Sequence, residues 1–87
     1  MIDQFVSKPD KLVYRRIEHL FESDGEKVWF KGTVLSFNAE NQEYTVAYDN
    51  EDEVFNFPLL EDLKNGELRI VSFFKKYILF VGKGSSY

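Results

Sequence analysis

The sequence lacks cysteine altogether and contains a single histidine, His19, among 87 residues. Without thiols, the chain has no disulfide framework, no thiolate nucleophile and no cysteine-based zinc site. On its expected strand, His19 shares a face with Ile17 and Phe21, which favours a packed histidine over a general base. No serine has a histidine at a triad-like spacing, and no glycine-rich phosphate loop is present. We therefore expect a non-catalytic protein with no metal and no cofactor.

Long apolar runs are also missing. No segment has the roughly 20 consecutive apolar residues that a membrane-spanning helix needs. The first residues do not show the basic and then apolar pattern of a signal peptide. We expect a soluble, intracellular protein that has no membrane partner.

Basic residues are scarce in the middle of the chain. From Glu40 to Glu67 there are nine acidic residues and one basic residue, Lys64. Such a segment repels phosphate backbones and attracts basic partners, so no direct contact with nucleic acid is expected. Basic residues near the N-terminus leave a nucleic-acid surface as a weaker alternative: Lys8, Lys11, Arg15 and Arg16. A solvated acidic rim without any partner is the simplest alternative.

Alternating apolar and polar residues, separated by short turn sequences, predict a meander of about five strands. The expected strands are 14–21, 28–37, 43–48, 53–57 and 68–71. Asp24-Gly25 is typical of a tight hairpin turn, and Gly32 indicates a bend or a close backbone approach. Pro58 ends the fourth strand, and a short helical turn is expected over 59–65, ending at Gly66. The pattern predicts an all-β fold, a small SH3-like barrel with a helical turn before its last strand.

We expect three parts along the chain: a leader over 1–11, the barrel over 12–71, and an apolar tail over 72–87. The tail is suited to add a strand, to cover an open barrel end, or to pair with another chain. The residues expected to form the core share the inner face of the strands and the helical turn: Ile17, Val34, Val46, Phe57, Leu60, Leu68 and Ile70.

Four aromatic residues are expected beside turns at the ends of strands, where one end of a small barrel would bring them together: Phe21, Phe30, Tyr48 and Phe55. Four rings there would enclose a pocket with negative π faces, which attract a methylated, poorly hydrated ammonium group. Acidic residues around the rim would steer a basic peptide toward it. Alternation alone favours the other interpretation, in which these four are core aromatics.

Four blocks of sequence carry a family resemblance. They are IEHLFE at 17–22, WFKGTVL at 29–35, YTVAYD at 44–49 and FPLLEDLKNGELRI at 57–70. In this order and spacing they resemble a spindlin (Spin/Ssty) repeat, most closely the second of the three repeats of that family. The last block is the most specific, and the resemblance covers roughly residues 12–70.

The resemblance implies a Tudor-like barrel that acts in the nucleus as a chromatin reader of histone tails trimethylated on lysine. It places the aromatic cage of the family on Phe21, Phe30, Tyr48 and Phe55. Phe30 stands where the family has tryptophan, and Phe55 where it has tyrosine. Three acidic residues match positions that, in the family, contact the histone tail: Glu22, Asp62 and Glu67.

Two departures from the family leave other functions open. This chain holds one repeat in place of three, and its tail has no counterpart. A methyl-arginine reader would use the same rings, because they also stack on a guanidinium group. A scaffold module without ligand binding, self-associating through residues 72–81, is the alternative from a different class.

Overall fold

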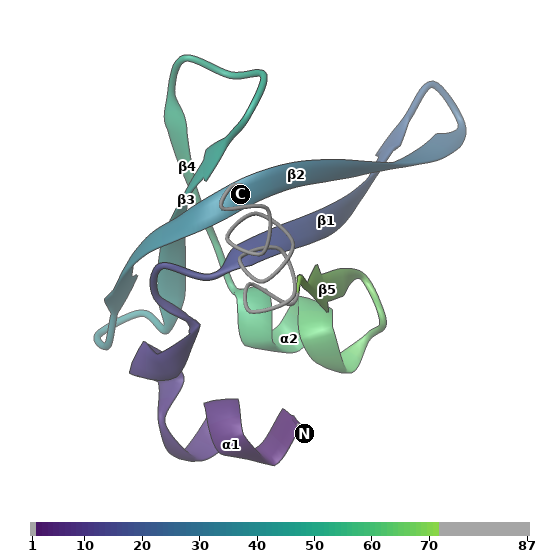
Figure 1. Ribbon diagram of the computed structural model, residues 1–87. Coiled ribbons are helices and arrows are strands. Elements are labelled where there is room, and N and C mark those ends of the chain that lie inside the picture. The colour runs from purple at the N-terminus through teal and green to yellow at the C-terminus, as the bar shows by residue number, and fades with distance from the viewer. Residues whose placement is uncertain (1, 72–87) are drawn as a thin grey trace, which may run out of the picture.

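One antiparallel sheet dominates the structure, a computed structural model that describes residues 2–71 (Figure 1). Its strands lie in the order β4-β3-β2-β1-β5, so each hairpin neighbour in sequence is also a neighbour in space. Their bounds are β1 Arg16–Ser23, β2 Glu26–Asn38, β3 Glu43–Tyr48, β4 Val54–Phe57 and β5 Leu68–Ile70. The expected all-β, SH3-like fold with five strands is confirmed. In the described part of the chain, hydrogen bonds do not close the sheet between β4 and β5, so it is an open sheet and not a closed barrel.

Local sequence explains the hairpins. In β3, Tyr44, Val46 and Tyr48 are buried and alternate with more exposed residues, as the period of two predicts. Between β1 and β2, Asp24 and Gly25 have φ angles of 52° and 82°. Two consecutive positive φ angles are the signature of the hairpin turn that matches the twist of its strands.

The long strand β2 belongs to both halves of the sheet. It pairs with β1 from Glu26 to Thr33 and with β3 from Gly32 to Asn38. At Gly32 a Cβ atom would lie 2.8 Å from the carbonyl oxygen of Ala47, so the close approach expected there is confirmed. An irregularity in register follows between Val34 and Ser36. β2 thus carries the change of direction between the two halves.

Within residues 2–71, three short helices lie outside the strands: α1 (Ile2–Ser7), the 3₁₀ helix η1 (Pro9–Leu12) and α2 (Leu59–Lys64). The helix α2 precedes β5, as the sequence predicts, and Gly66 follows it with a φ angle of 79°. The segment expected as a leader forms α1 and most of η1. The helix α1 packs beside α2 (Figure 1), and Phe5 of α1 and Leu12 at the end of η1 join the buried core.

Nine hydrophobic residues are buried among those described: Phe5, Leu12, Ile17, Val34, Tyr44, Val46, Tyr48, Leu59 and Leu68. Four of them were expected in the core. The other three expected residues, Phe57, Leu60 and Ile70, are half-buried and pack against it. The tail over 72–87, and with it the proposed sixth strand, lies outside the described residues.

Candidate functional site

A hollow of about 240 Å³ opens between the β1–β2 hairpin and the β3–β4 hairpin. Five aromatic side chains and one carboxylate line it: Phe21, Phe30, Tyr48, Phe55, Phe57 and Glu51. The structure therefore brings the four aromatic residues singled out in the sequence around one hollow. Phe57 was expected in the core, and Glu51 was not expected at the site.

Strand register and sheet curvature together assemble these rings. Phe30 pairs with His19, two residues before Phe21, so the two phenyl rings are diagonal neighbours on one face, with centroids 5.5 Å apart. Register does not explain the contact of Phe21 with Phe57 at 5.3 Å, because β1 and β4 are separated by two strands. The curled sheet brings the outer strand over toward β1.

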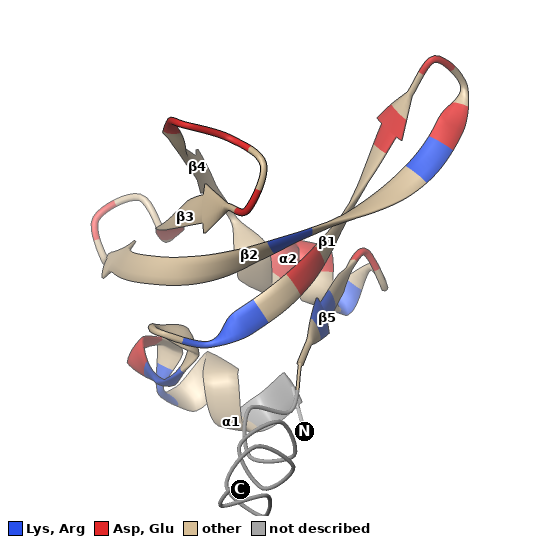
Figure 2. Ribbon diagram, turned by 45° about the horizontal axis from the view of Figure 1, so that its top comes forward, with Lys and Arg blue, Asp and Glu red and all other residues tan. Residues whose placement is uncertain are grey.

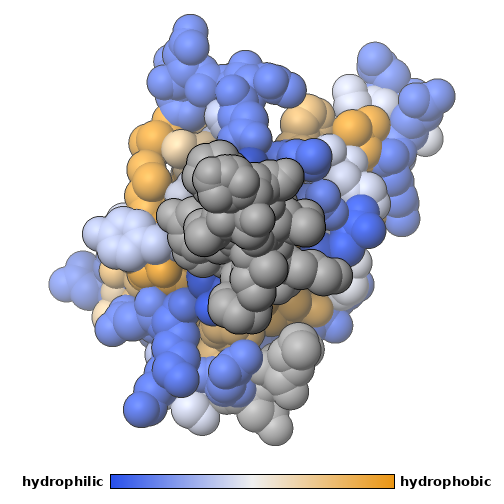
Figure 3. All heavy atoms as spheres, viewed as in Figure 1, coloured by the Kyte–Doolittle hydropathy of each residue, from blue (hydrophilic) through white to orange (hydrophobic). Residues whose placement is uncertain are grey.

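The rings meet edge to face or tilted, as aromatic pairs prefer. The centroid of Tyr48 lies 5.8 Å from that of Phe21 and 6.2 Å from that of Phe55. Phe55 is 37% exposed and Phe57 is half-buried, which leaves the hollow open to solvent on the β4 side. Hydrophobic residues border the hydrophilic loop at the end of β3 and β4 (Figure 3). The site is an apolar cup with an accessible mouth.

Negative charge collects beside the mouth. The loop between β3 and β4 carries exposed Glu51, Asp52 and Glu53, and Figure 2 shows this acidic loop next to β4. Glu51 lines the hollow itself, and its lining includes no basic side chain. A carboxylate at the edge of an apolar cup favours a cationic ligand.

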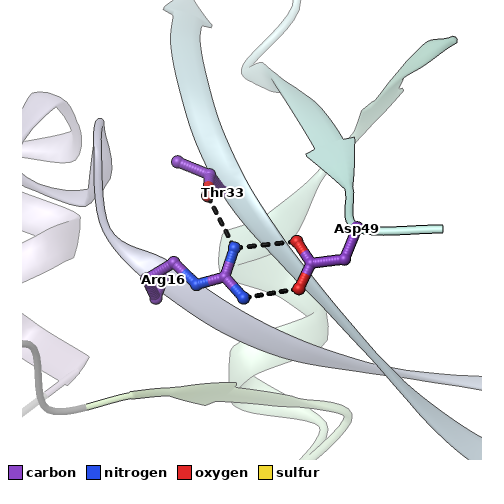
Figure 4. A network of polar contacts seen from close by, with 3 residues as sticks. All are labelled: Arg16, Thr33 and Asp49. Carbon is purple, nitrogen blue, oxygen red and sulfur yellow. Dashed lines mark hydrogen bonds and ion pairs between the residues drawn. The ribbon is translucent and has the colours of Figure 1, made fainter. Parts of the chain in front are cut away.

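An ion pair fixes the start of this loop (Figure 4). The Arg16 guanidinium donates to both carboxylate oxygens of Asp49, at 2.9 and 2.6 Å, and to the Thr33 hydroxyl at 2.8 Å. The Asp49 amide donates to the Lys31 carbonyl at 2.9 Å. A bidentate contact between a guanidinium group and a carboxylate has a defined geometry. It therefore holds the residues that lead from Tyr48 to Glu51.

Behind the rings lies a buried polar chain. His19 is 2% exposed, and its Nδ1 lies 2.7 Å from the Tyr48 hydroxyl while its Nε2 lies 2.7 Å from Asp62 Oδ2. Its ring packs against Phe21 and Phe57, with centroids 4.5 and 5.1 Å away. Burial, and then the charge of Asp62, raise the pKa of Tyr48, so its hydroxyl is protonated at neutral pH. His19 is the packed histidine that the strand pattern favoured.

The three acidic residues matched through the resemblance do not line the hollow. Glu22 is exposed near the end of β1, and Glu67 is exposed just before β5. Asp62 is turned toward His19. The carboxylate at the hollow is Glu51, whose only signal in the sequence was its place in the acidic segment after Tyr48.

Among residues 2–71 there is no cluster of three or more histidine and acidic side chains arranged to hold a metal ion. None of the helices in this part of the chain is long and apolar enough to cross a membrane. Comparison with models of known protein families found none that matches the chain.

Proposed function

We propose that this domain is a non-catalytic reader that binds the methylated ammonium group of a lysine in a basic peptide. The single observation that carries the proposal is the hollow lined by five aromatic rings and Glu51, with no basic side chain in its lining. Resemblance to the spindlin repeats suggests trimethyl-lysine of a histone tail as the ligand and the nucleus as the place of action.

Physical chemistry favours a methylated group over a bare ammonium ion at such a site. Trimethyl-lysine keeps its charge but is bulkier and more weakly hydrated. It therefore loses little free energy of hydration when it enters the ring-lined hollow. Each good ring contact is worth about 0.5–2 kcal/mol. A bare ammonium ion would lose strong hydrogen bonds to water in an apolar cup. The hollow thus discriminates through the cost of desolvation.

The size of the hollow fits a side-chain head group. At about 240 Å³ it is smaller than the roughly 300–1,000 Å³ pockets that hold drug-sized ligands. The acidic loop would attract the rest of a basic tail and raise the rate of association. A shallow cup with a few charged contacts should bind with roughly micromolar or weaker affinity.

A titration with matched peptides tests the proposal. Short capped basic peptides carry lysine or trimethyl-lysine at the same position, and calorimetry or fluorescence gives both dissociation constants. We expect the trimethylated peptide to bind at least about tenfold more tightly, which corresponds to one or two ring contacts. Absence of binding, or equal binding of both peptides, would overturn the proposal.

Two neighbouring residues of β4 provide a variant and its control. Phe55 lines the hollow, whereas Val54 is 52% exposed and is absent from its lining. Phe55→Ala should weaken binding of the trimethylated peptide by about twofold to thirtyfold, because a ring contact is lost. Val54→Ala should leave the affinity within about twofold.

Methyl-arginine is a second candidate ligand, and the position of Glu51 favours it. A guanidinium group stacks on aromatic faces and also donates N–H bonds, which trimethyl-lysine does not. A carboxylate in the lining supplies an acceptor for such bonds. A peptide with asymmetric dimethylarginine at the same position belongs in the titration: tighter binding than trimethyl-lysine, abolished by Glu51→Ala, would assign the site to arginine.

A further inference from the structure

We propose that Asp62 and His19 are positioning residues that hold the Tyr48 ring in the wall of the hollow. This inference rests on the proposed function. It assigns Asp62 an action on the ligand through His19 and Tyr48, in place of the direct contact that the family resemblance implies.

Two hydrogen bonds connect Asp62 of α2, through His19, to Tyr48 at the hollow. Asp62 Oδ2 lies 2.7 Å from His19 Nε2, and His19 Nδ1 lies 2.7 Å from the hydroxyl of Tyr48. The His19 side chain is 3% exposed and that of Asp62 is 20% exposed. Tyr48 lines the hollow at the other end of the chain, whereas His19 and Asp62 do not.

The chemistry of the groups fixes the direction of the hydrogen bond to Asp62, and, for a neutral imidazole, that of the bond to Tyr48 as well. An ionised carboxylate only accepts, so Nε2 of His19 donates to Asp62. In the neutral ring Nδ1 is then an acceptor, and the Tyr48 hydroxyl donates to it. Loss of the carboxylate removes the group that selects this tautomer. The His19 ring then no longer presents a fixed acceptor to the Tyr48 hydroxyl.

Packing extends the effect beyond one ring. The imidazole of His19 also contacts Phe21 and Phe57, so it supports three of the five rings that line the hollow. Asp62 itself is held in the first turn of α2, and its carbonyl accepts from the Glu67 amide at 2.8 Å. The placement of α2 therefore sets the shape of the hollow.

A double-mutant cycle separates this role from a direct contact. The probe is N-acetyl-trimethyl-lysine methylamide, which has no second basic side chain for Asp62 to bind. We expect Asp62→Ala and Tyr48→Phe each to weaken its binding by about threefold to tenfold, the worth of one buried hydrogen bond. The double variant should bind no more weakly than either single variant, since both changes interrupt the same series of hydrogen bonds. Multiplied effects, or an Asp62→Ala variant that binds the probe like the wild type, would overturn the proposal.

Two further variants on α2 control for loss of structure. Asp62→Asn keeps an acceptor oxygen of the same reach and should restore binding to within about twofold of the wild type. Glu61→Ala removes an exposed acid from the same helix and should have no effect on the probe. If Asp62→Asn binds as poorly as Asp62→Ala while melting like the wild type, the positioning role is wrong.

A spectroscopic measurement makes the proposal testable even if the reader function fails. The rate at which the Tyr48 ring flips, measured by NMR without any ligand, should rise in Asp62→Ala and stay slow in Asp62→Asn. Slow flipping in Asp62→Ala would refute the positioning role. If the wild-type chain does not bind the probe but the flip rates behave as expected, the proposed function fails and the positioning role stands.

Discussion

Tyr44 and Tyr48, two residues of one strand, show how the same side chain serves structure and site. The hydroxyl of Tyr44 donates to the Pro9 carbonyl at 2.9 Å and so ties β3 to η1. Tyr48 instead turns its ring to the hollow and its hydroxyl to His19. Burial, followed by the charge of Asp10, raises the pKa of Tyr44 to about 12. The buried phenol therefore makes stability sensitive to alkaline pH.

We expect the free energy of unfolding to fall above about pH 10. An unfolded tyrosine ionises near that pH while folded Tyr44 stays protonated, so its contribution is complete below about pH 10 and is lost as the pH rises to about 12. The loss through Tyr44 is about 2–3 kcal/mol. Urea denaturation at pH 8 and at about pH 12 measures it, with Tyr44→Phe as the comparison. A variant as alkali-sensitive as the wild type would contradict the assignment.

Among the elements, β2 has a strict local requirement at Gly32. Gly32 sits where β2 passes from pairing with β1 to pairing with β3, and a Cβ atom there would meet backbone and ring atoms of the facing strand. The nearest are the Ala47 carbonyl oxygen at 2.8 Å and Tyr48 Cδ1 at 3.0 Å. The geometry of this strand crossing and the position of a ring in the hollow therefore depend on the same glycine.

Gly32→Ala should lower the free energy of unfolding by about 1–3 kcal/mol, the usual cost of overpacking. Because the added methyl group pushes on Tyr48, affinity for trimethyl-lysine peptides should fall as well. Thermal denaturation and peptide titration measure the two effects. Ser36→Ala, an exposed change farther along β2, is the control. Wild-type stability in Gly32→Ala would show that the strands separate easily at this crossing.

Across the whole molecule, the N-terminal helix closes one side of a small core. Phe5 of α1 is 2% exposed and joins a buried cluster that includes strand residues and Leu59 of α2. A domain of this size has a total stability of only about 5–15 kcal/mol. A single large side chain from outside the sheet is therefore a considerable share of it.

Phe5→Ala should reduce stability by about 3–5 kcal/mol and lower the melting temperature clearly. A chain that begins at residue 12, where the sequence pattern alone would start the domain, should lose at least as much. Val6→Ala, next to Phe5 but 48% exposed, should change little. If the chain lacking residues 1–11 is as stable as the full chain, α1 contributes little to the stability of the fold.

Local patterns predicted the strands and turns better than the start of the domain or the extent of its core. The third strand, the Asp24-Gly25 turn and the helix end at Gly66 follow from side-chain period and glycine conformation, which need no information from distant residues. The helix at Ile2–Ser7 was missed because its apolar residues were too few to show a period of their own. Phe57 was assigned to the core since alternation shows which face a side chain takes, but not how far that face is covered.

Residue order was therefore sufficient for the number of strands and their succession, and the family resemblance was needed to group the four rings as one site. Three-dimensional packing alone settled which carboxylate stands at the hollow, and it selected Glu51, while Asp62 faces His19. The physical reason is the distance along the sequence over which each interaction acts. Alternation and turn chemistry act between neighbours in the chain, whereas the contact of β1 with β4 and the chain from α2 to Tyr48 exist only after the sheet has curled.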